Sequence, residues 1–117
     1  MLSLETLGYY RDEKKSQHYP WLFSLFYPSE GDFVAFVGDT SSRDLVLDVV
    51  QTFRGVARIK SDGVAAPWFL PGIDWSDQGP YWKQGYVGLM VTDTAPFRNP
   101  NYHRAGDLPE TLDYARL

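Results

Sequence analysis

The chain combines short apolar runs with one amphipathic helix. Residues 33–37 form a continuous apolar run followed by a glycine, which is typical of a strand buried on both faces. After Ser41 and Ser42, either of which can cap a helix, apolar residues recur at helical spacing between positions 45 and 53. Gly55 then provides the usual left-handed stop. A buried strand followed directly by a helix is therefore the clearest prediction from the pattern.

Weaker patterns predict the remaining elements. Residues 2–8 are apolar at alternate positions, as in a strand, and enclose one carboxylate. Residues 86–91 form a second apolar strand, and Pro109 sits where the first turn of a helix tolerates proline. Shorter elements are expected as extended pieces at 56–60 and 64–70 and as a helix at 80–84 that ends before Gly85. Two long loops are expected at 9–32 and 92–109, the first with room for a short helix of its own.

Alternating strands and helices predict an α/β protein with a mostly parallel sheet. The pattern starts inside a strand and stops soon after a helix begins, so we expect residues 1–117 to form a single partial domain. An incomplete sheet leaves an unpaired strand edge, which favours pairing with a second copy of the chain. A homo-oligomer joined through this edge is therefore expected.

Composition narrows the functional classes. The 117 residues are 44% hydrophobic and 22% charged, an ordinary globular balance, and the 16% of aromatic residues can build a substantial core. The net charge of -4 disfavours nucleic acid as a partner, because phosphate binding requires a basic surface. No apolar run approaches the length of a membrane span, and no signal peptide is visible, so no membrane partner is expected and the compartment stays open. The absence of cysteine excludes thiolate metal sites, disulfides and a cysteine nucleophile.

Four residues are candidates for chemistry. Glu5 lies near the carboxyl end of a predicted strand, where α/β sheets place their ligands, whereas a charged residue by itself is more often a solvated edge residue. His103 follows the strand at 86–91, and Asp107 comes four residues later, so the pair suits either an oriented metal ligand or a surface loop. Asp77 either caps the short helix after it or belongs to a site. Ser76, His103 and Asp77 lack the strand-turn-helix elbow of a serine hydrolase, so a nucleophilic triad is disfavoured.

Several sequence blocks resemble the closing part of the co-catalytic zinc aminopeptidases. That family includes bacterial leucyl aminopeptidases and aminopeptidase Y, and its fold is shared with glutaminyl cyclases. The resemblance covers nearly the whole chain in the same motif order. It is carried by Ser3 to Tyr10, by Ser76 to Trp82 with Gly85 and Tyr86, and by Leu89 to His103 followed by Asp107 to Tyr114.

The resemblance implies a function and assigns roles. It implies the C-terminal portion of a zinc exopeptidase fold, a partial three-layer α/β/α sandwich, in an enzyme that releases N-terminal residues from peptides. By resemblance, Glu5 is the carboxylate ligand of one zinc ion and His103 is the histidine ligand of the other. Asp77 and Asp107 would stand behind these ligands. Candidate residues for the wall of the peptide-substrate pocket are Tyr81, Tyr86, Phe97 and Tyr102.

Two departures from the family pattern limit what the chain can do by itself. Gln78 stands where the family usually has histidine, and an amide cannot accept a proton near neutral pH. The other histidine ligand, the bridging aspartate, the general base and its neighbouring glutamate all precede the Glu5 strand in the family, and only four residues precede Glu5 here. We therefore expect no catalytic base and only weak zinc binding without the missing N-terminal half. Three interpretations stay open: an aminopeptidase part, a glutaminyl-cyclase-like acyltransferase part, and a non-catalytic interaction module.

Overall fold

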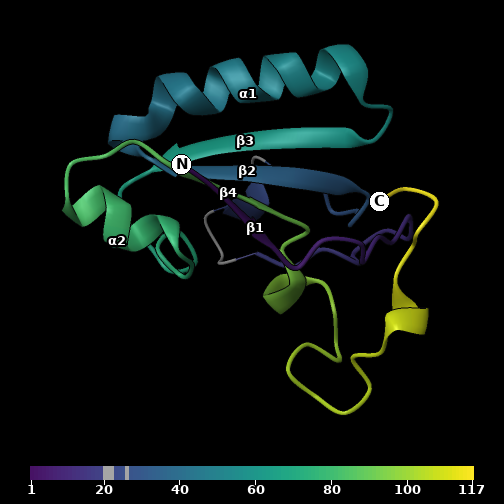
Figure 1. The fold of residues 1–117 in the computed structure, drawn as a ribbon. Coiled ribbons are helices and arrows are strands. Elements are labelled where there is room, and N and C mark those ends of the chain that lie inside the picture. The colour runs from purple at the N-terminus through teal and green to yellow at the C-terminus, as the bar shows by residue number, and fades with distance from the viewer. Residues whose placement is uncertain (20–22, 26) are drawn as a thin grey trace.

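The computed structural model describes residues 1–19, 23–25 and 27–117 and has a mixed α/β fold. A four-stranded sheet carries the long helix α1 on one face, and the short helix α2 lies beside one end of the sheet (Figure 1). The elements are the strands β1 (Leu2–Glu5), β2 (Phe33–Asp39), β3 (Lys60–Ala66) and β4 (Leu89–Thr92), and the helices α1 (Arg43–Val56) and α2 (Gln78–Lys83). In the described part of the chain, no helix has the length and apolar character needed to cross a membrane.

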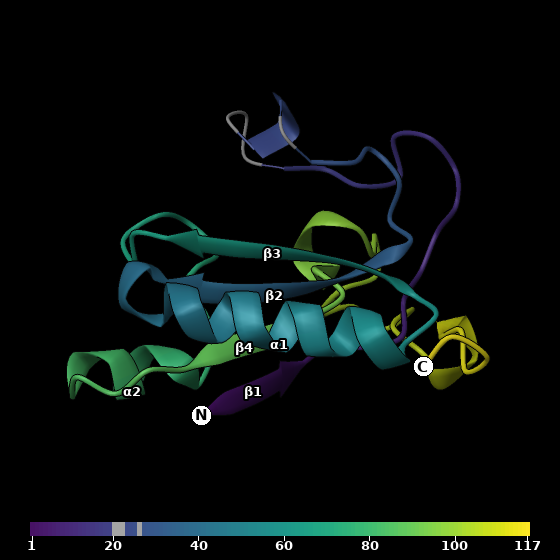
Figure 2. The same ribbon diagram turned by 90° about the horizontal axis from the view of Figure 1, so that it is seen from above.

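The strand order is β1-β4-β2-β3, which places β1 and β3 at the edges of this sheet (Figure 2). The pairs β1–β4 and β2–β3 are parallel, whereas β2 and β4 are antiparallel. The predicted mostly parallel sheet in an α/β fold is therefore confirmed. Because β1 and β4 run in the same direction, their carboxyl ends lie side by side at the same end of the sheet.

The central strand β2 is buried along its whole length, as the apolar run predicted. Val34 and Phe36 belong to a core cluster that includes Val46 and Val50 of α1. The alternate residue Phe33 packs on the opposite face, in a second cluster that includes Ala35, Val37, Ile73 and Met90. The period of two along β2 thus divides the core into one half beneath α1 and one half beneath the loops.

Helix α1 begins and ends differently from the prediction. Ser42, one of the two predicted caps, takes the N-cap position of α1, but its side chain makes no capping hydrogen bond. Asp39 caps the turn before the helix: its Oδ1 accepts the Ser42 amide at 2.9 Å and its Oδ2 accepts the Ser41 hydroxyl at 2.6 Å. A 3-10 turn at Thr40–Ser42 precedes the helix. At the other end, Gly55 is a helical residue and the helix continues to Val56, so Gly55 does not end it.

Three strands have other boundaries than the sequence predicted. Strand β1 ends at Glu5 because Thr6 has φ 47°, so the predicted strand 2–8 is shortened. One strand, β3, replaces the two extended pieces expected at 56–60 and 64–70. Strand β4 begins at Leu89, three residues later than expected. Helix α2 begins at Gln78, and Gly85 follows its end with φ 79° as expected. The loop at 9–32 contains the 3-10 turn Phe23–Leu25.

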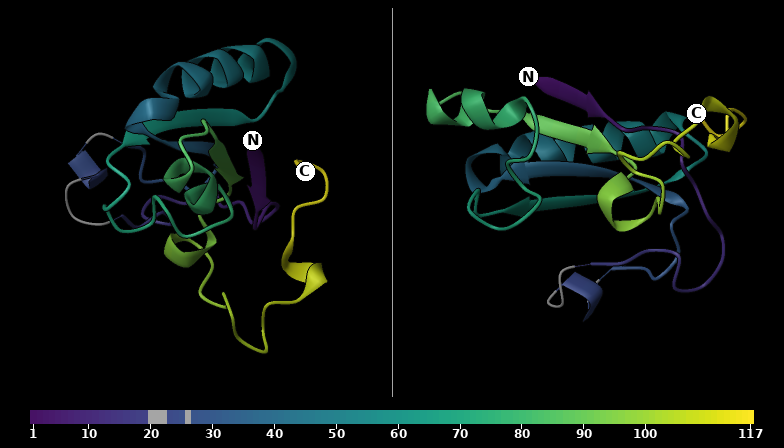
Figure 3. Two further views of the ribbon diagram at one scale, coloured as in Figure 1. Left: turned by 60° about the vertical axis from the view of Figure 1, so that its left-hand side comes forward. Right: turned by 90° about the horizontal axis from the view of Figure 1, so that it is seen from below.

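The predicted helix starting at Pro109 is wrong. The segment makes one 3-10 turn, Pro109–Thr111, and Leu112 is extended with ψ 145°. The Asp113 amide then donates to the Gly8 carbonyl at 2.7 Å, so a tertiary hydrogen bond takes the place of the next helical turn. Figure 3 shows this C-terminal segment leaving the sheet in a wide loop, and its end returns to the segment after β1, where Arg116 bonds Asp12.

Strand β1 has an uncovered apolar face. Its side chains alternate: Ser3 is buried, whereas Leu2 and Leu4 are 53% and 69% exposed. Their parallel partners in β4, Leu89 and Val91, are buried in the cluster that includes α1. The apolar surface of the sheet therefore continues beyond the part that α1 covers.

Candidate functional site

The first candidate residue, Glu5, lies where the carboxyl ends of β1 and β4 meet. Glu5 is the last residue of β1 and lies opposite Thr92, the last residue of β4. The chain turns sharply after both strands, with φ 47° at Thr6 and φ 63° at Thr94. The two turns are joined by the Thr6 and Thr92 hydroxyls, whose oxygens are 3.1 Å apart. Non-glycine residues in the left-handed conformation cost energy and are concentrated at functional sites, so two of them at this end of the sheet indicate a candidate site.

The carboxylate of Glu5 is held by a short chain of hydroxyl groups. The Ser76 hydroxyl donates to Glu5 Oε1 at 2.5 Å, and Ser3 Oγ lies 3.0 Å from Ser76 Oγ. Since the hydroxyl hydrogen of Ser76 is used in the hydrogen bond to Glu5, the Ser3 hydroxyl is the donor in the second contact. The half-buried carboxylate is thereby fixed through Oε1, and no hydrogen bond from a described residue occupies Glu5 Oε2.

A pocket of about 140 Å³ opens beside Glu5 on the sheet face opposite α1. Its floor is apolar and comes from the sheet, and loops close its sides. Several polar side chains line the end formed by the two sharp turns, and Asp62 of β3 is a second carboxylate in the lining. The apolar floor and walls include Phe33, Ala35, Val37, Met90, Ile73 and Phe97, and the polar end includes Glu5, Ser76, Thr6, Thr92 and Thr94. Such a pocket suits an apolar group attached to a polar head that reaches Glu5.

The four aromatic residues expected in the pocket wall separate into two pairs. Phe97 and Tyr102 line the pocket, and Phe97 stacks on Trp75 with ring centres 6.0 Å apart. Tyr81 and Tyr86 lie on and just after α2, exposed, and contact each other at 6.4 Å. They are not among the residues that line this pocket.

Within the described part of the chain, the remaining candidates neither line the pocket nor form a metal centre with Glu5. His103 is exposed in the loop after β4, with φ 56° and its ring stacked on Tyr102 at 3.9 Å. Asp107 accepts a hydrogen bond from the Asn99 amide at 2.9 Å. Asp77 is exposed and precedes α2 without a side-chain capping bond. Among residues 1–19, 23–25 and 27–117, no group of three or more carboxylate and imidazole side chains could hold a metal ion.

Gln78 has a structural position in the fold. It is fully buried at the start of α2, and its side-chain amide donates to the Ile73 carbonyl at 2.8 Å. This bond ties α2 to the loop that carries Ser76. The glutamine thus supports the pocket wall.

Sequence reasoning missed two buried residues of opposite charge behind the site, Asp93 and Arg98, each bound to the backbone of Tyr9. Asp93, 1% exposed, directly follows β4 and accepts the Tyr9 amide at 2.8 Å. Arg98, 6% exposed, donates to the Tyr9 carbonyl at 3.2 Å, to the Phe33 carbonyl at 3.0 Å and to Gln17 Oε1 at 2.7 Å. Its guanidinium also lies over the Phe33 ring at 4.6 Å. A loop Asp or Arg is ordinarily exposed, so no local signal in the sequence announces this pair.

Burial of these charges shifts their pKa values in opposite directions. Removal from water raises the pKa of Asp93 to about 6, although the Tyr9 amide and the Arg98 guanidinium oppose the shift. Burial likewise lowers the pKa of Arg98, which the charge of Asp93 opposes. The opposite charge of each residue thus partly offsets the effect of burial on the pKa of the other.

The raised pKa of Asp93 predicts a pH-dependent stability. The folded chain holds this proton more tightly than the unfolded chain, so the contribution of Asp93 to the free energy of unfolding falls as pH rises. Between pH 4 and pH 7 the decrease is about 2 kcal/mol for a shift of this size. Urea unfolding should therefore show that the free energy of unfolding of the wild type, relative to that of Asp93→Asn, decreases as the pH rises from 4 to 7. A difference that stays constant with pH would contradict the expectation.

Comparison with known proteins identifies one longer relative. No protein-family model matches the chain, and no solved structure matches it. The chain is similar to the uncharacterized protein YfbL of Escherichia coli (strain K12), with 37% identity over 118 residues. The similarity covers 100% of this chain and 36% of YfbL. The whole chain therefore corresponds to little more than a third of a longer polypeptide.

Proposed function

We propose that this chain is the C-terminal part of a zinc-dependent aminopeptidase-like hydrolase. In the complete site Glu5 is a ligand for one zinc ion, His103 is a ligand for the other, and Phe97 and Tyr102 contribute to the substrate pocket. The observation that carries the proposal is the Glu5 carboxylate, held by Ser76 at the polar end of an apolar pocket. A pocket of this form suits an apolar N-terminal side chain with its reacting amide near the carboxylate.

The donor set of this chain does not fit a zinc ion by itself. A catalytic zinc site typically has three protein ligands, whereas Glu5 and His103 would each serve a different ion. The other ligands and the general base must come from outside these 117 residues. The same proposal extends the fold to a three-layer α/β/α sandwich, in which further helices cover both the sheet face opposite α1 and the apolar residues Leu2 and Leu4 beyond α1.

A hybrid protein tests this function. In it, the present chain replaces the matching segment of YfbL, and zinc content and hydrolysis of leucine p-nitroanilide are measured. We expect two zinc ions per chain and hydrolysis. Glu5→Gln and His103→Gln should each lower the zinc content by roughly one ion, because each removes one of about three ligands. The exposed Glu13→Gln and His18→Gln are matched controls that should lose none.

Other outcomes distinguish the alternatives. A zinc-containing hybrid that cyclises N-terminal glutamine and does not hydrolyse peptides would indicate a glutaminyl-cyclase-like acyltransferase. A folded hybrid without zinc or hydrolysis, prepared alongside an active YfbL, would indicate a non-catalytic interaction module. A stoichiometric submicromolar zinc site in the isolated chain would contradict the division of ligands proposed here.

The free edge of β1 also leads to a proposal about assembly. One side of β1 pairs with β4, and its other side has no strand partner in this sheet, next to the exposed Leu2 and Leu4. We expect the isolated chain to form dimers through this edge. Light scattering should show a dimer that Leu4→Lys dissociates, whereas Leu47→Lys, on the exposed side of α1, leaves it intact. A monomer at all concentrations would contradict this expectation.

A further inference from the structure

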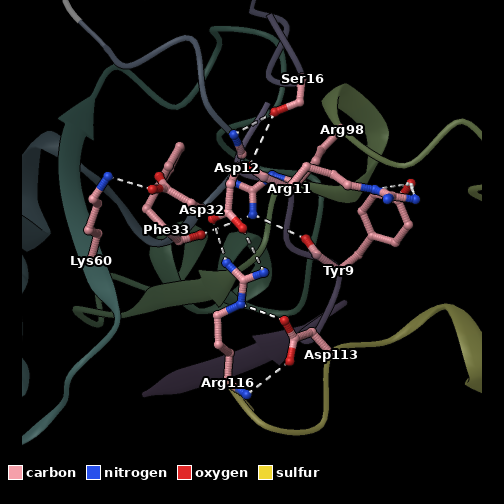
Figure 4. Close-up of polar contacts among 11 residues, drawn as sticks. Tyr9, Arg11, Asp12, Ser16, Asp32, Phe33, Lys60, Arg98, Asp113 and Arg116 are labelled. Atoms are coloured by element: carbon pink, nitrogen blue, oxygen red, sulfur yellow. Dashed lines mark hydrogen bonds and ion pairs between the residues drawn. The ribbon is translucent and has the colours of Figure 1, made fainter. Parts of the chain in front are cut away.

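One residue in the segment after Glu5 has both of its backbone polar groups bound by buried charges. The Tyr9 amide donates to Asp93 Oδ2 at 2.8 Å, and the Tyr9 carbonyl accepts from Arg98 Nη1 at 3.2 Å. Figure 4 shows Arg98 reaching the carbonyl groups of Tyr9 and Phe33. Hydrogen bonds to charged groups are about twice as strong as those between neutral groups, so the backbone here is held firmly.

The two charged residues belong to the segment that leads from β4 to His103. Asp93 follows the last residue of β4, and its own amide donates to the Thr6 carbonyl at 3.0 Å. Arg98 follows the 3-10 turn Ala95–Phe97. The contacts therefore join the segment directly after Glu5 to the segment directly after β4.

We infer that Asp93 and Arg98 are positioning residues that clamp the backbone of Tyr9 and thereby hold the segment after Glu5 against the segment leading to His103. The clamp itself follows from the contacts, whereas its service to two zinc ligands rests on the proposed function. Both segments contain a left-handed residue, Thr6 or Thr94, which an unbraced turn would not readily keep. The clamp holds these turns in place before any ligand binds.

Asp39 provides a matched control for Asp93. It is also a buried carboxylate, 8% exposed, and it also accepts one backbone amide, that of Ser42 at 2.9 Å. It is the last residue of β2, which is antiparallel to β4, so it lies at the opposite end of the strands from Asp93. Substitutions of Asp39 therefore remove a similar interaction without touching the clamp.

The first experiment measures the clamp in the 117-residue chain without metal. Hydrogen exchange by NMR should show the Tyr9 amide exchanging about tenfold faster in Asp93→Ala, since one charge-assisted hydrogen bond is lost. Asp93→Asn keeps an acceptor without the charge and should give an intermediate rate. Asp39→Ala should accelerate exchange at Ser42 and leave Tyr9 unchanged. An unchanged Tyr9 amide in Asp93→Ala would overturn the clamp.

The second experiment measures its consequence in the YfbL hybrid. Asp93→Ala should weaken zinc binding about 10- to 100-fold, as is usual for groups that orient ligands, and Asp93→Asn should recover part of the loss. Asp39→Ala should lower the melting temperature similarly and leave zinc affinity unchanged. Equal losses of affinity in both alanine variants would reduce Asp93 to a general stabilising role and overturn the inference. If the wild-type hybrid holds no zinc, the proposed function fails, and the exchange experiment still decides the clamp.

Discussion

Replacing Arg98 with alanine is expected to lower the free energy of unfolding by about 3–5 kcal/mol at pH 7. The substitution removes donors from the carbonyls of Tyr9 and Phe33 and from the Gln17 side chain, all in the interior. It also removes the positive charge that opposes the raised pKa of the buried Asp93 carboxyl group, which adds to the cost at pH 7. Urea denaturation followed by circular dichroism measures the loss.

Two further measurements separate charge from hydrogen bonding. At pH 4 the loss in Arg98→Ala should be smaller, because Asp93 is then protonated and needs no counter-charge. Arg98→Lys should fall between the wild type and the alanine variant, since lysine keeps the charge but not the planar set of donors. The exposed Arg43→Ala, which removes only a surface ion pair, should change stability by less than about 0.5 kcal/mol. A loss below 1 kcal/mol in Arg98→Ala would contradict the role of this residue.

Phe36→Ala is expected to cost about 3–5 kcal/mol of folding free energy. Phe36 is 2% exposed at the centre of β2, and its ring packs edge-on against Phe53 of α1 with centres 5.1 Å apart. Alanine leaves a cavity between helix and sheet that neither rigid element can collapse to fill. Thermal or urea unfolding provides the measurement.

An exposed aromatic residue serves as the control for this cavity. Phe69 is 67% exposed in the loop after β3, so Phe69→Ala should change stability by less than about 0.5 kcal/mol. Phe36→Leu should recover much of the loss, because leucine refills most of the volume. If Phe36→Ala and Phe69→Ala cost the same, the cluster beneath α1 is not the principal core.

The elements that could be predicted from sequence are those set by local pattern. The run 33–37 had no polar residue to place in water, so it had to be a strand buried on both sides, and α1 followed from its helical spacing. Gly85 marked the end of α2 because its positive φ suits a residue without Cβ. These features depend on near neighbours and therefore appear in the sequence.

The errors arose where a distant contact decided the structure. The segment after Pro109 had a good helical start, yet the amide of Asp113 binds the carbonyl of Gly8 at the other end of the chain. The antiparallel pairing of β2 with β4 is equally non-local. Asp93 and Arg98 looked like ordinary loop charges because burial is a property of the assembled fold. The predicted strands made Glu5 and His103 candidates by their position, and only the family resemblance assigned them to two zinc ions.

The parallel pairing of β1 with β4 has a consequence for the order of folding. Strands β2 and β3 and the helix between them are close in sequence and can assemble early, at a small entropic cost of loop closure. Pairing β1 with β4 closes a loop that contains almost all of the other elements, so it is the slower step. The edge that carries Glu5 should therefore form last, and in native-state exchange it should open before the β2–α1–β3 unit does.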